Sequence, residues 1–180
     1  MPDVLMLRHC ESDGFTADAP LTPLGYQQAA RLAERLAEMP VDYVVSSPYR
    51  RALESIAPFA QSRGLSMHTD ARLEERRRNR DNTPIANWDE WVRQSFQDLD
   101  FRSPGGESGR DVARRGASVL CETMSSSHEL PLLSTHGQLM SFLANSIDSD
   151  FGYERAGLMA YPALLRFRCT HGGLAFETVF

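Results

Sequence analysis

Two apolar runs that each end in a histidine place the strongest constraint on the fold of this chain. Val4 to Leu7 leads directly into Arg8 and His9. Leu130 to Ser134 leads in the same way, one residue later, into His136. A continuous apolar run of this length predicts a strand that is buried on both faces of a sheet. Ligands of open α/β sheets bind beyond the carboxyl ends of the strands, so we expect both histidines at that edge.

Segments with helical spacing alternate with short strands along the rest of the chain. Thr22 and Pro23 form an N-cap followed by a first-turn proline, and the apolar spacing from Ala29 to Leu36 predicts a helix. The same reasoning predicts strands at about 41–45 and 65–69. Ser46-Ser47-Pro48 repeats the N-cap and proline signal and predicts a helix that extends to about residue 63. Further helices are predicted over about 85–99, around 112–120 and from 139, and residues 164–169 and 174–180 are predicted to form a C-terminal hairpin. We therefore predict an α/β fold, a three-layer α/β/α sandwich with a largely parallel central sheet and helices on both faces.

The length of the chain and the lack of a repeat or linker in its sequence predict one domain. Its 180 residues can bury a sizeable core, and they contain neither an internal repeat nor a linker, so the expected domain spans residues 1–180. Within it, residues of about 70–108 combine a charge-dense stretch, a helix-like stretch and a glycine-rich turn. We expect this part to form a lid or cap-like insertion. Its apolar stripe, Trp88, Val92 and Phe96, is predicted to pack in the core or under the lid.

The composition excludes several classes of function. All 19 basic residues are arginines, which excludes Schiff-base chemistry on lysine and the phosphate loop that requires one. The net charge of −5 argues against a nucleic-acid partner. Three scattered cysteines indicate a reducing compartment. No basic region precedes the apolar run in Met1-Pro2-Asp3, and no run approaches the length of a membrane span, so we expect a cytoplasmic protein without a signal peptide.

Four polar residues are expected to meet at the carboxyl edge of the sheet. They are Arg8, His9, Arg51 in the first turn of its helix, and His136. Two guanidinium groups and two imidazoles suit a doubly charged anion, and a phosphate monoester carries about −1.5 to −2 charge at pH 7. An imidazole can also act as a nucleophile. The alternative is a strand end with solvated polar residues.

The segments around these residues resemble, in order, the motifs of the histidine phosphatase superfamily, which includes the phosphoglycerate mutases. The matching segments are Leu7-Arg8-His9-Cys10-Glu11-Ser12, Leu21-Thr22-Pro23-Leu24-Gly25-Tyr26-Gln27-Gln28-Ala29, Ser46-Ser47-Pro48-Tyr49-Arg50-Arg51-Ala52, Leu73-Glu74-Glu75-Arg76, Pro104-Gly105-Gly106-Glu107-Ser108 and Thr135-His136-Gly137. The resemblance implies a phosphoglycerate mutase-like fold. It covers most of the chain, and the order of the motifs is more specific than any one of them.

The resemblance also implies roles for individual residues. His9 would be the nucleophile that accepts the phosphoryl group as a phosphohistidine, and Arg8, Arg51 and His136 would hold the phosphoryl oxygens. Glu75 would be the general acid and base, with Glu74 as the fallback; ion pairing of both carboxylates with the neighbouring arginines is the alternative. The implied substrate-binding residues are Arg8, Ser12, Thr22, Arg51, His136 and Gly137. The implied chemistry needs no metal and no cofactor.

Three departures from the family pattern favour a phosphatase over a mutase. Cys10 replaces the usual glycine beside the nucleophile, and a thiol next to two arginines is expected to be reactive. Phe15 stands where the mutase branch generally has an asparagine, and residues 76–91 lack the family's Gly-x-Trp-x-Gly run. The arginine-rich stretch Arg76 to Arg80 has three interpretations: a solvated face, a nucleic-acid patch, or the mouth of the substrate site. His68, His128 and His171 are expected to be surface or structurally satisfied histidines.

The resulting hypothesis is a metal-independent phosphomonoesterase that acts through a phosphohistidine intermediate on a small phosphorylated metabolite. Three alternatives stand beside it: a phosphoglycerate mutase, a phosphatase for phosphohistidine on a partner protein, and a phospho-ligand binding module without turnover. The expected partner is the small phosphorylated substrate, with neither nucleic acid nor membrane. The pattern allows a homodimer without requiring one.

Overall fold

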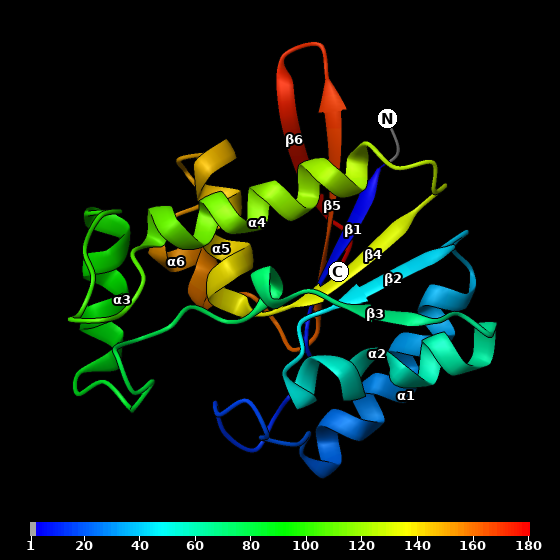
Figure 1. Cartoon of the computed structure of the whole chain (residues 1–180), viewed down its shortest axis with the longest axis horizontal. Helices are drawn as coiled ribbons and strands as arrows, with labels where there is room; N and C mark the ends of the chain where they lie inside the picture. The colour runs from blue at the N-terminus through cyan, green and yellow to red at the C-terminus, as the bar shows by residue number, and fades with distance from the viewer. Residues whose placement is uncertain (1–2) are drawn as a thin grey trace.

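The computed structural model describes residues 3–180 and is built around a six-stranded sheet (Figure 1). The expectation about the extreme N-terminus rests partly on Met1 and Pro2, which lie outside the described residues. The strands are β1 (Val4–Arg8), β2 (Tyr43–Ser46), β3 (Met67–Thr69), β4 (Pro131–Thr135), β5 (Ala163–Thr170) and β6 (Gly173–Thr178). The helices are α1 (Pro23–Ala37), α2 (Arg50–Arg63), the 3-10 turn η1 (Ala71–Leu73), α3 (Trp88–Gln97), α4 (Gly109–Met124), α5 (Gly137–Ile147) and α6 (Tyr153–Gly157).

The order of the strands brings the two histidine-bearing strands next to each other. Across the sheet the order is β3-β2-β4-β1-β5-β6. The first four of these strands are parallel, whereas β5 is antiparallel to β1 and β6 is antiparallel to β5. The predictions of a largely parallel sheet and a C-terminal hairpin are confirmed. Because Arg8 pairs with Thr135, the carboxyl ends of β1 and β4 lie side by side.

Helices cover both faces of this sheet, as the sequence predicts. In Figure 1, α1 and α2 lie on one face, and α4 and α5 lie on the other. Leu5 and Leu7 pack into the cluster with α1 and α2, whereas Val4 and Met6 pack into the cluster with α4 and α5. Alternate side chains of β1 thus enter two separate apolar layers. This double burial explains the continuous apolar run and confirms the three-layer α/β/α sandwich.

Several helix ends follow the local sequence. The Thr22 hydroxyl accepts a hydrogen bond from the Gly25 amide at 3.0 Å and caps α1. Ser108 caps α4 in a reciprocal arrangement with Asp111. Gly64 ends α2 in the left-handed region, with φ of 63°. At the start of α2 the prediction is less accurate, because the N-cap position belongs to Tyr49 and no side chain caps it.

The largest differences from the predicted elements concern helices α3 and α6. The helix predicted to follow Thr83-Pro84 begins only at Trp88, because Asn82 and Asn87 adopt positive φ values of 50° and 53° and keep the intervening chain in turns. Helix α6, which the sequence analysis does not predict, spans five residues and buries none of them. It therefore has no apolar periodicity to detect. Across residues 3–180, helices with the length and apolarity of a bilayer span are absent.

Candidate active site

A cavity of about 350 Å³ lies beyond the carboxyl end of β1, between the first turns of α2 and α5. Its walls also include residues of α3, α6 and the loop that follows β1. Six of the residues predicted for the site line it: Arg8, His9, Ser12, Arg51, Glu75 and Gly137. Among the described residues, His136 and Thr22 are the predicted ones that do not contribute to the wall. The six predicted residues thus come together from four segments that are distant in the sequence.

The hydrogen bonds of His9 leave one ring nitrogen unprotonated. Nδ1 lies 2.6 Å from the carbonyl oxygen of Cys10, which can only accept, so Nδ1 carries the hydrogen and donates it. Nε2 accepts a hydrogen bond from Nε of Arg51 at 3.1 Å. Burial, the charge of Arg51 and the charge of Arg8 lower the pKa of His9 to about 3, against the opposing hydrogen bond to Cys10. His9 is therefore neutral at pH 7 and carries a lone pair on Nε2.

Arg51 connects the nucleophile candidate to the loop that follows β1. Its side chain is buried in the first turn of α2, and Nη1 donates to the carbonyl oxygens of Phe15 at 3.2 Å and Thr16 at 2.7 Å. Burial lowers the pKa of Arg51, with Glu75 among the groups that oppose this shift. Its charge has no ion-pair partner among residues 3–180. An anion bound beside it would supply the missing counter-charge.

Arg8 lies across the segment that precedes β5. Nη1 donates to the carbonyl oxygen of Met159 and, at 3.4 Å, to that of Ala160. The guanidinium carbon stacks 3.5 Å from the ring centroid of Tyr161. Its Nε atom is buried and has no hydrogen-bond partner within residues 3–180. A buried donor of this kind is costly to leave unpaired, so Arg8 is suited to receive an oxygen acceptor.

Gly137 makes this position of Arg8 possible. A Cβ atom at Gly137 would lie 3.0 Å from Nε of Arg8 and 3.1 Å from its guanidinium carbon. Contacts this short force one of the two groups to move. The absence of a side chain at the start of α5 therefore allows the guanidinium to cross the first turn of that helix.

We predict that Gly137→Ala lowers kcat/KM for a phosphomonoester about tenfold, because the methyl group shifts the Arg8 guanidinium from its position in the cavity wall and small misplacements of such groups are costly. The measurement is steady-state hydrolysis of p-nitrophenyl phosphate, with thermal unfolding to confirm that the fold is retained. Gly152→Ala is the matched control, since a Cβ atom there would meet nothing within 4 Å. Equal rates for Gly137→Ala and the native chain would show that the position of Arg8 has no influence on the reaction.

His136 lies behind His9 and not in the cavity wall. It is fully buried, its Nε2 lies 2.8 Å from the hydroxyl oxygen of Ser47, and its ring centroid lies 5.1 Å from that of His9. Burial, and after it the charge of Arg51, holds the pKa of His136 well below its usual value. The described geometry therefore gives His136 a neutral ring in edge-on contact with His9. Its predicted contact with phosphoryl oxygens stays a prediction.

Of the two neighbouring carboxylates, Glu75 faces the cavity. Its Oε1 accepts a hydrogen bond from the Arg76 amide at 2.9 Å, and its Oε2 accepts one from the Gln138 amide at 3.3 Å, in the first turn of α5. Glu74 is not part of the cavity wall formed by residues 3–180. The geometry favours Glu75 over the fallback Glu74 as the group that exchanges protons with a ligand.

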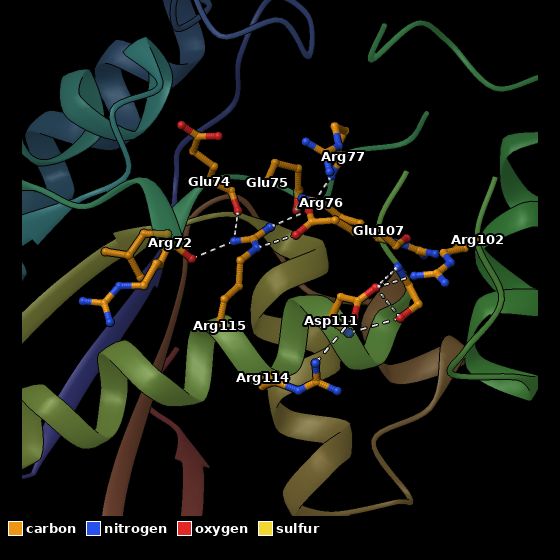
Figure 2. Close-up of polar contacts among 12 residues, drawn as sticks. Arg72, Glu74, Glu75, Arg76, Arg77, Arg102, Glu107, Asp111, Arg114 and Arg115 are labelled. Carbon is orange, nitrogen blue, oxygen red and sulfur yellow. Dashed lines mark hydrogen bonds and ion pairs between the residues drawn. The ribbon is translucent and has the colours of Figure 1, made fainter. Parts of the chain in front are cut away.

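A network of ion pairs and backbone contacts holds the segment that carries Glu75 (Figure 2). Arg115 donates to the carbonyl oxygens of Arg72 and Glu74 at 2.6 Å each, and its Nε pairs with Glu107 at 2.8 Å. Glu107 in turn accepts from the Arg77 amide at 2.9 Å. Burial opposes the charge of Glu107, but Arg115 holds the pKa of this carboxyl below its usual value. The Gly-Gly-Glu-Ser turn thus acts at a distance, through the backbone of residues 72–77.

The expectation that the Cys10 thiol is reactive is wrong. Its side chain is fully buried in the apolar cluster between the sheet and α1 and α2. Burial raises the pKa of the Cys10 thiol to about 11, against the hydrogen bond with Ser55. The thiol is therefore protonated and shielded at neutral pH. Its neighbouring arginines point into the cavity, so their charge does not activate it.

The hydroxyl groups of Thr22 and Ser12, two other predicted site residues, form hydrogen bonds within the protein. The Thr22 hydroxyl, besides capping α1, donates to the carboxylate of Glu11 at 2.8 Å. Both of its hydrogen-bonding functions are therefore engaged within the protein. The Ser12 hydroxyl does line the cavity, and it donates to the carbonyl oxygen of Gly14 at 3.0 Å.

Sequence reasoning missed three residues that shape the site. Ser47, which contacts His136, directly follows β2 and could have been found from the strand-end argument that identified Arg8 and His9. Tyr161, whose ring centroid lies 5.5 Å from that of His9, sits in a segment without any motif. Gln138, whose amide holds Glu75, acts through its backbone, which no side-chain pattern reveals.

The sheet topology and this cavity define an α/β protein of phosphoglycerate mutase-like fold, with a neutral imidazole and two arginines at the carboxyl edge. The sequence profile of the histidine phosphatase superfamily (branch 1) matches residues 4–179. The chain belongs to this superfamily and is an enzyme of its phosphatase and phosphoglycerate mutase-like type.

Individual relatives show the range of this similarity. The probable phosphoglycerate mutase GpmB of Proteus mirabilis (strain HI4320) is 29% identical over 161 residues, which cover 82% of this chain and 75% of that protein. A mycobacterial glucosyl-3-phosphoglycerate phosphatase in complex with inorganic phosphate matches with a TM-score of 0.81 at 23% identity, covering 100% of this chain and 96% of the other. A phosphoserine phosphatase mutant of Entamoeba histolytica in complex with phosphoserine matches with a TM-score of 0.75 at 18% identity, covering 99% and 96%. At these identities the two structures show a shared fold.

Proposed function

We propose that this enzyme is a metal-independent phosphomonoesterase that hydrolyses a small phosphorylated metabolite through a phosphohistidine at His9. The observation that carries the proposal is the state of His9. Its Nδ1–H is donated to a backbone carbonyl, and its unprotonated Nε2 lies in a cavity that also contains Arg8 and Arg51. This is the arrangement that a nitrogen nucleophile requires.

In the first step, Nε2 of His9 attacks phosphorus and the bond from phosphorus to the ester oxygen breaks. Arg8 and Arg51 stabilise the charge on the phosphoryl oxygens during the transfer. Glu75, in its protonated form, gives its proton to the departing alkoxide, so the products are an alcohol and a phosphohistidine. The Arg51 hydrogen bond to Nε2 is exchanged for one to a phosphoryl oxygen in this step.

In the second step, the Glu75 carboxylate takes a proton from water, and the water oxygen attacks phosphorus. The bond from phosphorus to Nε2 breaks, inorganic phosphate leaves, and His9 returns to its neutral form. Glu75 ends the cycle protonated, as it began. In this proposal the arginines Arg8 and Arg51 balance the phosphate charge; among residues 3–180, no three His, Cys, Asp or Glu side chains are grouped to hold a metal ion.

The shape of the cavity supports a small substrate. A volume of about 350 Å³ falls at the lower end of the range for small-molecule sites. Residues of α3 and α6 form part of its wall, so a phosphorylated side chain of a folded partner protein would have to reach past them. This favours a metabolite over phosphohistidine on a partner protein.

A phosphoglycerate mutase is the second candidate, because relatives that are 29% identical carry that name. In a mutase the phosphohistidine would return its phosphoryl group to the glycerate and not to water. Product analysis with 3-phosphoglycerate separates the two activities. A phosphatase releases glycerate and inorganic phosphate, whereas a mutase forms 2-phosphoglycerate.

The proposal is tested with a panel of phosphorylated metabolites, assayed for released phosphate with and without EDTA. Rapid quenching under alkaline conditions, followed by mass spectrometry, then locates the phosphorylated residue. We expect turnover of at least one member, rates that EDTA does not change, and a phosphoryl group on His9. A rate that chelation abolishes would overturn the metal-independent mechanism, and phosphorylation elsewhere would overturn the assignment of the nucleophile.

A further inference from the structure

The arginines of Arg76 to Arg80 occupy very different environments. Arg76 is buried; it donates to the carbonyl oxygens of Glu107 at 2.9 Å and Phe101 at 3.0 Å and stacks on Trp91 at 4.0 Å. This arginine supports the fold. Arg77 and Arg80 are exposed. Only Arg78 among them lines the cavity within residues 3–180.

Two aromatic rings hold the Arg78 guanidinium. Its carbon lies 4.0 Å from the ring centroid of Phe15 and 4.5 Å from that of Trp88. Phe15 belongs to the loop after β1, and Trp88 is the first residue of α3. Neither ring offers an oxygen acceptor, so these cation–π contacts leave the N–H donors of the guanidinium available to a ligand.

Among the described residues, no protein group uses those donors. Within residues 3–180, the Arg78 side chain forms neither a hydrogen bond nor an ion pair, and its one hydrogen bond is from the backbone amide to Asn82 at 3.2 Å. The side chain is partly buried, and this burial lowers the pKa of Arg78, although the nearby charge of Glu75 opposes the shift. The site thus holds a positive charge that has no ion-pair partner within residues 3–180.

The position of this charge suits the leaving-group side of a substrate. Arg8, His9 and Arg51 define the place of the phosphoryl group at the end of β1, and Arg78 lines the same cavity near Trp88 and Val92 of α3. Arg8 and Arg51 donate hydrogen bonds to backbone carbonyl oxygens, whereas the Arg78 side chain contacts the rings of Phe15 and Trp88. A second anion on the substrate could therefore meet Arg78 while the phosphoryl group meets His9.

We propose that Arg78, held between Phe15 and Trp88, is a specificity-determining residue that binds a second anionic group, a carboxylate or a second phosphate, on the leaving group of the substrate. This inference rests on the proposed phosphomonoesterase function. A planar guanidinium with free edge donors binds either anion through paired hydrogen bonds. The contacts with both rings position the guanidinium before the substrate arrives, so little side-chain freedom is lost on binding.

The test compares substrates that differ only in the second group. 3-Phosphoglycerate and glycerol 3-phosphate share a carbon skeleton and differ in a carboxylate against a hydroxymethyl group. 1,3-Propanediol bisphosphate and propyl phosphate provide the corresponding pair for a second phosphate. In the native enzyme we expect kcat/KM to be about tenfold to a hundredfold higher for the anionic member of at least one pair. The pair that shows the preference identifies the anion.

Arg78→Met is expected to remove this preference. It should lower kcat/KM about tenfold or more for the preferred anionic substrate and less than threefold for its neutral partner. Arg80→Met is the matched control, because Arg80 is exposed and two residues away, and it should leave both values unchanged. Equal loss on both substrates would show that Arg78 only holds the cavity walls together, and would overturn the proposal. An absence of any preference in the native enzyme would overturn it as well.

A binding measurement separates this proposal from the proposed reaction. Calorimetric titration of the His9→Ala variant, with and without Arg78→Met, compares affinities for the same substrate pairs in the absence of turnover. Weaker binding of only the anionic member supports the role of Arg78 even if no phosphatase activity is found. If p-nitrophenyl phosphate is hydrolysed but Arg78→Met changes neither binding nor kcat/KM selectively, the reaction stands and the assignment of Arg78 fails.

Discussion

Replacement of His9 by alanine is expected to lower hydrolysis of p-nitrophenyl phosphate by about 10⁴-fold or more. The methyl group of alanine cannot form the covalent intermediate, and among residues 3–180 the other imidazole near the cavity, His136, is fully buried behind His9. The result would be a loss of kcat, because the arginines that hold the phosphoryl group remain. Mass spectrometry of the quenched variant should show no phosphorylated histidine.

The control for this variant is His171→Ala. His171 is exposed in the turn between β5 and β6, so its removal should leave the rate unchanged. Substantial activity in His9→Ala, with a phosphoryl group on another residue, would contradict the role of His9 as nucleophile. Thermal unfolding of both variants shows whether a lost rate reflects a lost fold.

We also expect the native protein and these variants to differ in how the free energy of unfolding depends on pH. The pKa of His9 is about 3 in the folded protein, against 6.5 ordinarily, so between these values the unfolded chain binds a proton that the folded chain excludes. The free energy of unfolding of the native protein should therefore decrease as pH falls below about 6.5, by up to about 1.4 kcal/mol per pH unit from this group. His9→Ala should show a shallower decrease, and His171→Ala the native slope. Parallel curves for native protein and His9→Ala would contradict a buried neutral His9.

Replacement of Glu75 by glutamine is expected to slow hydrolysis of alkyl phosphates by about 10²–10⁴-fold, equivalent to about 3–5 kcal/mol of barrier. The amide cannot give a proton to the leaving alkoxide. p-Nitrophenolate leaves without that proton, so the first step with p-nitrophenyl phosphate should be much less affected. The difference between the two substrates is the specific effect of a general acid.

The measurement must isolate the first step, because Glu75 is also proposed to activate water in the second. Rapid mixing with p-nitrophenyl phosphate resolves the burst of p-nitrophenolate from the slower steady state. In Glu75→Gln we expect a preserved burst and a slow steady state. Glu74→Gln is the matched control, since Glu74 lies next in sequence and outside the cavity wall formed by residues 3–180. An equal loss of the burst and of alkyl phosphate hydrolysis would contradict the role of Glu75 as acid.

Helix caps and buried strands were accessible to sequence analysis because their causes are local. Thr22 caps α1 three residues away, and the run from Val4 to Leu7 is apolar because both of its faces are covered. The start of α3 was not accessible in this way. It depends on positive φ values at Asn82 and Asn87, which asparagine tolerates but does not require.

For the site, strand-end reasoning predicted the cluster that the structure forms at the carboxyl edge. Arg8, His9 and Arg51 meet there because parallel neighbouring strands end at the same edge and α2 starts beside them. The same reasoning could not distinguish a residue in the cavity wall from one behind it. His136 lies behind His9, and the thiol of Cys10 is buried away from the arginines that were expected to activate it.

The amino-acid order alone determined the layered α/β architecture and the gathering of positive charge and imidazoles beyond two strands, because burial of apolar side chains and the direction of parallel strands follow from the pattern. Only the tertiary structure decided that Nε2 of His9 is the unprotonated nitrogen, that Glu75 and not Glu74 faces the cavity, and that Arg78 contacts Phe15 and Trp88 and has no ion-pair partner among the described residues. Each of these depends on contacts between segments far apart in the chain, and their geometry is set by how the layers pack.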